Sequence, residues 1–151
     1  RYDSVAQRGA EIEFLNSVTK YFLEQLSTVE ALRLFIEEVC KFCKWPLGHI
    51  YLPDKNDSNL LRPSKIWFIE SEGQFDDFKK YSEETLLKRG EGFCGKILES
   101  AQPRWITDLE GEADFPRKDL LLQEKVRSGF GLPIMVMDRV FAVAEFLRLS
   151  P

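Results

Sequence analysis

The segment that decides the fold is residues 45–53, which read Trp45-Pro46-Leu47-Gly48-His49-Ile50-Tyr51-Leu52-Pro53. Pro46 disfavours helical backbone at the residue before it, so the helical pattern upstream has to end near Trp45. After Gly48 the apolar period changes from about 3.6 to about 2, with His49 and Tyr51 on one face and Ile50 and Leu52 on the other. A helix followed by a strand that ends at Pro53 is therefore predicted.

Two helices are predicted before this strand. Apolar residues recur at helical spacing over residues 10–26, which indicates an amphipathic helix. Ser27 and Glu30 have the spacing of a capping box, so a second helix is predicted to begin there with almost no loop between the two. The expected buried stripe of this helix consists of Leu32, Phe35, Ile36, Val39, Cys40 and Cys43.

More strands and shorter helices are predicted after Pro53. Residues 65–70 are rich in β-branched and aromatic side chains, which predicts an antiparallel neighbour for the first strand. Residues 71–89 are mostly polar, and a short helix with a mobile loop is expected there. A turn is predicted to lead into a short helix over residues 96–100, because positive φ is accessible at Gly90, Gly92 and Gly95.

The last third of the chain predicts a brief strand over residues 104–106 and a helix from Asp114 to about Val126. Two strands follow, over residues 129–137 and 140–147, joined by a tight turn at Asp138-Arg139. This order of elements predicts an α+β fold, with a central antiparallel sheet of five or six strands flanked by helices.

Composition narrows the classes of protein to which the chain can belong. The 151 residues are 44% hydrophobic and 30% charged, as expected of a globular domain. A net charge of -4 gives no basic excess for nucleic acid, and no apolar run approaches the roughly 20 residues needed to cross a bilayer. Three cysteines without a secretory leader predict a reducing, cytoplasmic location. The first and last residues, Arg1 and Pro151, indicate a segment of a longer protein.

Several short motifs, in their order and spacing, resemble those of GAF domains, which are PAS-related sensory modules. The similarity covers residues 28–146, is greatest to GAF domains of bacterial two-component sensors, and is carried by residues 45–51, 90–96 (Gly90-Glu91-Gly92-Phe93-Cys94-Gly95-Lys96), 103–108, 115–117, 129–134 and 143–146. It implies a GAF domain over residues 28–151, without the family's closing helix, and a signalling or dimerisation helix over residues 1–27.

The residues provide little support for catalysis or a metal site. His49 is the only histidine and has no serine or cysteine motif beside it, so a hydrolytic triad is not expected. The acidic pairs Asp76-Asp77 and Glu83-Glu84 are interpreted as solvated. Cys40 and Cys43 form a Cys-x-x-Cys motif that could bind zinc with Cys94 and His49, but both lie on an apolar helix stripe, where cysteine is usually a core residue. No metal and no cofactor are expected.

Other GAF functions leave signatures that can be compared with this sequence. The turn at Cys94 resembles that of free methionine sulfoxide reductases, but the second cysteine of that family has no counterpart between Ile106 and Ser128. The Cys-His pair of bilin-binding members is absent, and the ordered motif of cyclic-nucleotide-binding members is not present. Reductase activity remains a distant alternative.

The resemblance implies a ligand pocket between the sheet and its covering loops. Its expected lining is Tyr51, Trp67, Phe75, Phe78, Phe93, Cys94, Trp105, Asp108 and Phe130. An apolar or aromatic molecule is expected to lie against Trp105 and Trp67, although these aromatic residues could equally be ordinary core. Arg117 could pair with Asp114 or Asp119, whereas Glu145, on a buried strand, has to find donors or become protonated.

These observations predict a sensory, non-enzymatic GAF domain of a bacterial two-component protein such as a histidine kinase. Its expected partners are an unidentified small molecule and a second copy of the chain, bound through the helix over residues 10–26. The competing hypothesis is a dimerisation and spacer module with a collapsed pocket. The residues alone do not separate these two hypotheses.

Overall fold

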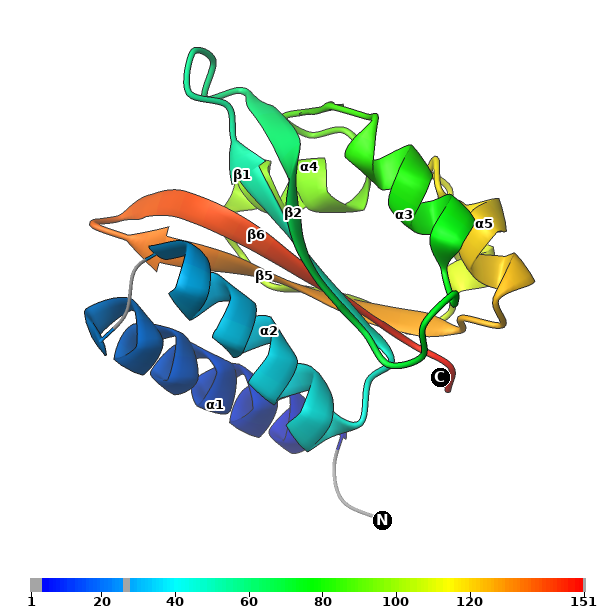
Figure 1. Cartoon of the computed structure of the whole chain (residues 1–151), viewed down its shortest axis with the longest axis horizontal. Coiled ribbons are helices and arrows are strands. Elements are labelled where there is room, and N and C mark those ends of the chain that lie inside the picture. Colours follow the sequence, from blue (N-terminus) through cyan, green and yellow to red (C-terminus); the bar gives the residue numbers. More distant parts are fainter. Residues whose placement is uncertain (1–3, 26–27, 151) are drawn as a thin grey trace.

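Strand β1 (Leu47–Pro53) lies near the middle of an antiparallel sheet of six strands, in the order β3-β2-β1-β6-β5-β4. The computed structural model describes residues 4–25 and 28–150 of the chain. The other strands are β2 (Leu60–Ile69), β3 (Leu87–Lys88), β4 (Arg104–Ile106), β5 (Ser128–Val136) and β6 (Arg139–Arg148). The predicted α+β class with a helix-flanked antiparallel sheet is confirmed (Figure 1).

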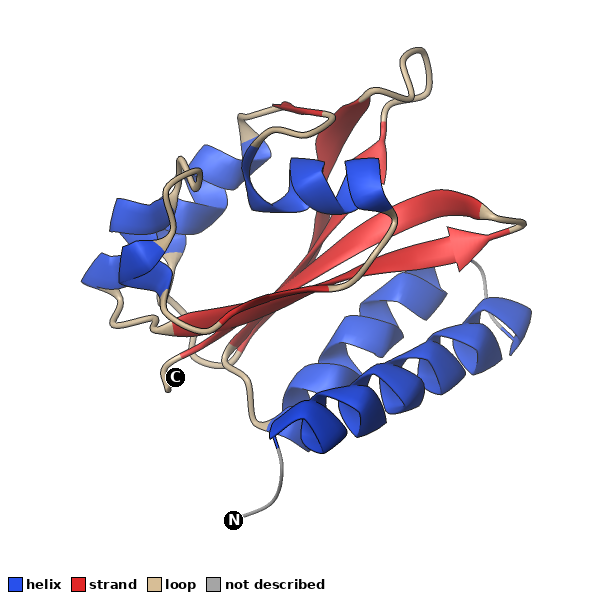
Figure 2. Cartoon of the chain, turned by 180° about the vertical axis from the view of Figure 1, so that it is seen from behind, coloured by secondary structure: helices blue, strands red, loops and turns tan. Residues whose placement is uncertain are grey.

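Helices cover both faces of the sheet. Helices α1 (Ser4–Gln25) and α2 (Thr28–Cys43) lie side by side on one face. The opposite face carries α3 (Asp76–Glu83), α4 (Gly92–Ser100), α5 (Lys118–Gln123) and the 3-10 helix η1 (Leu109–Gly111) (Figure 2). The two layers of helices enclose two separate hydrophobic clusters, one on each side of the sheet.

The alternation of side chains along β1 and β6 assigns each residue to one of the two layers. Tyr51 and Val143 belong to the cluster under α3–α5, whereas Ile50, Ala144 and Phe146 belong to the cluster under α1 and α2. The two strands are adjacent, and the register pairs His49 with Glu145. Polar side chains at these two positions therefore enter the α3–α5 layer together.

Two positions in this layer require glycine. Gly92, at the start of α4, has a φ of 64°, which side-chain-bearing residues rarely adopt. Gly131 lies under α4, where an added Cβ would clash with the side chains of Ile97 and Phe93. Glycine at position 131 therefore lets α4 pack directly on β5.

The helix boundaries differ from those predicted. Helix α1 begins at Ser4 instead of residue 10, and α4 begins at Gly92 instead of residue 96. Helix α5 covers only Lys118–Gln123, since Lys125 adopts a left-handed φ of 66° shortly after it. Leu26, Ser27 and the predicted capping box lie outside the described residues.

The strand boundaries differ as well. Strand β2 begins at Leu60, five residues before the predicted strand, because Leu60 and Leu61 pair with β3. The region predicted as a short helix and mobile loop contains α3 and β3. The β5–β6 turn is centred on Met137 and Asp138, both with positive φ, one residue earlier than expected.

Candidate functional site

The structure divides the nine predicted site residues between the two faces of the sheet. Six of them belong to the α3–α5 layer: Tyr51, Trp67, Phe75, Phe78, Phe93 and Cys94. Trp105 and Phe130 belong to the opposite cluster, with ring centroids 4.3 Å apart. Asp108 is exposed. Because the sheet separates Trp67 from Trp105, one small ligand cannot contact both, which corrects the predicted pocket.

The centre of the α3–α5 layer is a buried ion pair between Glu145 and Arg117. Glu145 projects from β6, and Arg117 immediately precedes α5. The guanidinium binds the carboxylate in a bidentate arrangement, with Nη2–Oε1 and Nη1–Oε2 distances of 2.8 and 2.9 Å. The exposed fractions of Glu145 and Arg117 are 0% and 2%. This pairing corrects the prediction of Arg117 with Asp114 or Asp119, because Asp114 instead binds Lys96.

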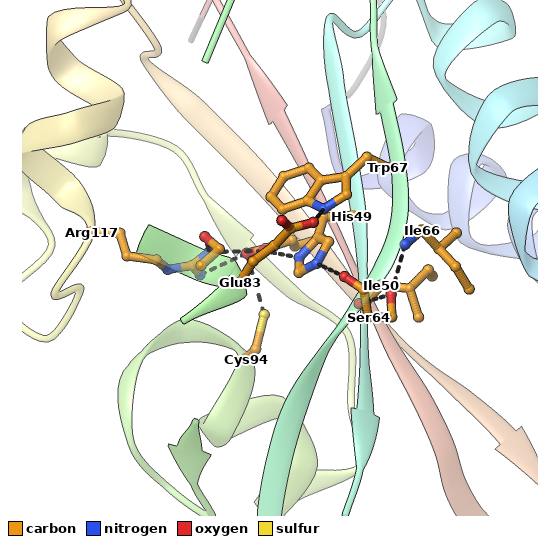
Figure 3. A network of polar contacts seen from close by, with 10 residues as sticks. His49, Ile50, Ser64, Ile66, Trp67, Glu83, Cys94 and Arg117 are labelled. Carbon is orange, nitrogen blue, oxygen red and sulfur yellow. Dashed lines mark hydrogen bonds and ion pairs between the residues drawn. The ribbon is translucent and has the colours of Figure 1, made fainter. Parts of the chain in front are cut away.

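The Glu145 carboxylate has two further neighbours that can donate hydrogen bonds, His49 and Cys94, and both are labelled in Figure 3. His49 Nδ1 lies 3.0 Å from Oε2, and Cys94 Sγ lies 3.4 Å from Oε1. Burial alone would raise the pKa of Glu145, but the Arg117 charge and the hydrogen bonds from Arg117 and His49 hold it well below its ordinary value. The carboxylate is therefore ionised, and all four of its lone-pair positions are used.

Aromatic rings enclose the Arg117 guanidinium. Its central carbon lies 4.7 Å from the ring centroid of Phe78, 5.2 Å from that of Phe115 and 5.5 Å from that of Tyr51. Nη1 also donates to the hydroxyl of Ser82, on α3, at 3.0 Å. Rings at these distances attract a cation through their negative faces. Helices α3 and α5 are therefore linked to the sheet through one arginine side chain.

His49 occupies the other side of the carboxylate. Its ring stacks on Trp67 at a centroid distance of 3.7 Å, and Nε2 lies 3.3 Å from the carbonyl oxygen of Ser64. Burial lowers the pKa of His49 more than the Glu145 carboxylate raises it, so the neutral ring is favoured at pH 7. The Trp67 indole donates to Glu83 at 2.9 Å, so this carboxylate is not simply solvated as predicted.

The Tyr51 hydroxyl is a buried polar group without a hydrogen bond of normal geometry to any described residue. The side chain is 0% exposed and packs with its ring edge against His49. Burial raises the pKa of this hydroxyl above its ordinary value, although the Arg117 charge and the nearby Ser82 hydroxyl oppose the shift. Native proteins rarely leave such a group unpaired. A polar atom of a ligand would satisfy it.

The cysteines do not form a common site. Cys40 packs in the α1–α2 layer, where its sulfur would contact a Cβ added at Gly48, whereas Cys94 and His49 lie on the other side of the sheet. The sheet thus separates the residues considered for zinc. Burial raises the pKa of the Cys94 thiol, and the neighbouring Glu145 carboxylate raises it further. Cys94 is a buried hydrogen-bond donor to the Glu145 carboxylate.

Sequence reasoning identified Glu145 as a carboxylate that needs donors, but it missed the roles of Arg117, His49 and Ser82. A charged residue in the apolar register of a strand was the available signal. These partners come from other elements or their ends. Arg117 and His49 are 28 and 96 residues from Glu145 in the sequence, and Ser82 is 35 residues from Arg117. No local pattern links residues that far apart.

Two surface hollows lie away from this network. One, of about 1030 Å³, is bounded by α1, the end of α2 and the end of β6. The other, of about 720 Å³, lies between the start of α2, the β1–β2 hairpin and the tip of the β5–β6 hairpin. Among the described helices, none is long and apolar enough to cross a membrane.

Known proteins provide a comparison for this arrangement. The sequence model of the GAF domain family matches residues 25–150. A GAF domain of A. aeolicus nlh2, solved in an inactive state, is 23% identical, with a TM-score of 0.65, and the match covers 91% of this chain and 78% of that one. No curated protein matches this chain.

Two further solved structures are similar in fold. The GAF domain of a phosphoenolpyruvate-protein phosphotransferase from Coxiella burnetii is 16% identical, with a TM-score of 0.67, and covers 93% of this chain and 78% of its own. The free methionine-R-sulfoxide reductase of Neisseria meningitidis, solved with its substrate, is 16% identical, with a TM-score of 0.66 and coverage of 99% and 78%. With the family model matching most of its length, this chain belongs to the GAF domain family.

Proposed function

We propose that this GAF domain is the sensory module of a bacterial signal-transduction protein, such as a histidine kinase. It binds a small molecule between the sheet and helices α3–α5 and passes the bound state to α1 and α2. The observation that carries the proposal is the fully buried network of Glu145, Arg117 and His49, beside the unpaired hydroxyl of Tyr51.

A spacer domain has little use for such a network. Buried ion pairs lose most of their Coulomb energy to desolvation, and apolar residues of similar volume often stabilise a protein equally well or better. Clusters of buried groups with shifted pKa values are instead typical of functional sites. The Arg117–Glu145 pair therefore supports a binding role over the competing hypothesis of a collapsed spacer.

The chemistry of the network suggests the class of ligand. The rings of Tyr51 and Phe78 already contact Arg117 and Trp67 stacks on His49, so a ligand enters this layer by displacing part of that packing, and the Tyr51 hydroxyl suits a polar atom on it. Proteins of similar fold support a small molecule as the ligand. The Neisseria enzyme was solved with its substrate, and a Staphylococcus aureus NreA structure carries a mutation in its nitrate binding site.

The same strands connect this site with α1 and α2. Glu145 faces the network, while its neighbours Ala144 and Phe146 face the opposite layer, and Phe146 packs against Phe35 of α2 with ring centroids 6.2 Å apart. A ligand that binds more tightly to one arrangement of β6 increases the population of that arrangement, and the packing of α2 changes with it. The difference between the ligand's affinities for the two arrangements sets the size of this population shift. This is the proposed path of the signal.

A thermal-shift screen of cyclic nucleotides, tetrapyrroles, amino acids and aromatic metabolites tests the proposal. A ligand at a hundred times its Kd adds about 2.7 kcal/mol of stability, enough to raise Tm by several degrees. Tyr51→Phe is expected to reduce the shift while leaving the unliganded protein folded, because it removes only the unpaired hydroxyl. Trp105→Phe, on the other face, is the matched control and should keep the shift.

The proposal fails if no compound raises Tm. It also fails if Tyr51→Phe and Trp105→Phe change the response of every hit equally, since binding would then be elsewhere. The spacer hypothesis takes its place in either case.

A further inference from the structure

Figure 1 shows the tip of the β5–β6 hairpin beside the start of α2. Together with the β1–β2 hairpin, these segments line the hollow of about 720 Å³. We name this surface the hairpin groove, lined by Thr28, Val29, Leu32, Leu52, Pro53, Arg62, Ile66, Val136, Met137, Arg139, Val140 and Phe141. We propose that the hairpin groove is a docking site for a partner protein's peptide segment that carries a carboxylate beside apolar side chains. Its lining contains none of Glu145, Arg117, His49 and Tyr51, so the inference is independent of the proposed ligand site.

The groove concentrates exposed apolar side chains. Val29, Val136 and Met137 are 54%, 37% and 91% exposed, and all three line it. Large apolar residues gathered at one exposed spot usually mark an interaction site. Because Met137 projects almost entirely into solvent, a small enclosed ligand would leave it uncovered, whereas a peptide segment laid along the hairpin would cover it.

Neither packing nor backbone conformation explains methionine at position 137. Its φ of 51° and that of Asp138, 62°, are the left-handed values of a tight hairpin turn, for which asparagine and glycine are preferred. Methionine adapts its shape to many apolar partners and is common at binding surfaces. An intermolecular contact accounts for a residue that disfavours the turn and buries almost nothing within the chain.

The charge of the groove selects the partner. Its only charged lining residues are Arg62 and Arg139, and neither forms an ion pair within the described part of the chain. The acids adjacent in sequence to lining residues, Glu30, Asp54 and Asp138, are not part of the lining. A basic, apolar groove on a chain of net charge -4 is electrostatically complementary to a carboxylate.

Other occupants fit these charges less well. A twofold contact between two copies of the groove would bring four arginines into one interface with no acid from either lining, which is repulsive. An anionic membrane would meet only two arginines on a protein of net negative charge. An acidic, apolar peptide segment satisfies both the arginines and the exposed side chains.

The test is selection of a phage-displayed 12-residue peptide library on the intact chain, followed by anisotropy titration of the labelled winners. We expect enriched peptides with aspartate or glutamate next to leucine, isoleucine, phenylalanine or methionine, and binding that weakens with salt. Arg62→Glu/Arg139→Glu and Met137→Asp should each weaken binding about tenfold or more. Lys80→Glu/Arg104→Glu, with the same change in charge at exposed sites outside the groove, should bind as the original chain does.

Circular dichroism and Tm of each variant verify that it is folded. The proposal is overturned if no peptide is enriched, if the winners lack acids, or if the groove variants bind them unchanged. It is also overturned if the groove variants abolish self-association in sedimentation, or binding to phosphatidylglycerol vesicles, instead of peptide binding.

Discussion

At the scale of single residues, the site depends on one carboxylate that four groups share. The Glu145 carboxylate is contacted by two nitrogens of Arg117, by one nitrogen of His49 and by the sulfur of Cys94. All four of these side chains are buried. A buried charge is tolerated only when it is paired and hydrogen-bonded. The protonation and stability of the whole layer therefore respond to changes at Glu145 or His49.

Replacing Glu145 with glutamine should destabilise the domain by about 3–5 kcal/mol, because it leaves the buried Arg117 guanidinium without a counter-ion. The double variant Arg117→Met/Glu145→Leu removes both charges and should recover most of that loss. Urea denaturation of the original chain, Arg117→Met, Glu145→Leu and the double variant measures the coupling, and the same measurement on Glu145→Gln gives its loss. Equal losses in Glu145→Gln and the double variant would contradict the importance of the pairing.

Acid should destabilise the domain through His49, the only histidine. Its pKa is lowered in the folded state, so the unfolded chain takes up a proton first as the pH falls below about 6.5. The free energy of unfolding keeps its full His49 contribution above that pH. Below it, the free energy of unfolding decreases by up to about 1.4 kcal/mol per pH unit. Loss of the Glu145 charge adds to this only below about pH 4.5, since the pKa of Glu145 is also lowered.

Chemical denaturation at pH 7.5, 6.5 and 5.5 measures this dependence. His49→Gln keeps a hydrogen-bonding side chain that does not titrate, and it should show a nearly flat profile over the same range. A variant profile as steep as that of the original chain would assign the effect to other groups.

At the scale of elements, the start of α3 and the β5–β6 turn each place a residue in a left-handed backbone conformation that its type does not favour. Helix α3 begins after Phe75, which has a left-handed φ of 63° and no side-chain cap, and Phe75 is nevertheless fully buried. Tertiary packing of its ring therefore overrides the backbone preference. The β5–β6 turn has the same conflict at Met137, but there no burial offsets it.

Replacing Met137-Asp138 with Asn-Gly should stabilise the domain by about 0.5–1 kcal/mol, because these residues suit two consecutive left-handed positions. The midpoint of urea denaturation measures the change. The same variant should weaken binding of the peptides selected on the hairpin groove. A lower midpoint would show that the Met137 side chain stabilises the chain itself, contrary to its exposure of 91%.

At the scale of the whole molecule, the sheet separates two layers with different tasks. The α3–α5 layer contains the ionic network, and the α1–α2 layer is apolar and contains the stacked pair Phe14 and Phe42, with ring centroids 4.5 Å apart. Phe42 is 70% exposed beside the larger of the two hollows. Self-association through this side is therefore still expected, although α1 packs part of its predicted dimer face, Phe14 and Val18, on the rest of the domain.

Analytical ultracentrifugation should show a concentration-dependent dimer, and Phe42→Asp should shift it to monomer because the exposed ring is replaced by a charge. Tyr81→Asp, a partly exposed aromatic residue on α3 and so on the other side of the sheet, is the matched control. A strict monomer at high concentration would refute dimerisation through α1 and α2.

Local patterns were sufficient for the elements and the fold class. The change of period at residues 45–53, the apolar stripe of α2 and the position of β4 follow from neighbours within a few residues, and all three are present in the structure. Helix ends were less predictable, because α5 ends near Lys125, whose left-handed backbone has no local sequence signal.

The sequence by itself therefore determined the α+β class, the order along the chain of every strand except β3, and the need of Glu145 for donors, because periodicity and burial are local properties. Only the tertiary structure decided that Arg117, His49 and Cys94 are those donors and that Trp67 and Trp105 lie on opposite faces. The reason is physical: sheet register and helix packing bring residues 28 to 96 positions apart to one carboxylate, and that register is a property of the whole sheet.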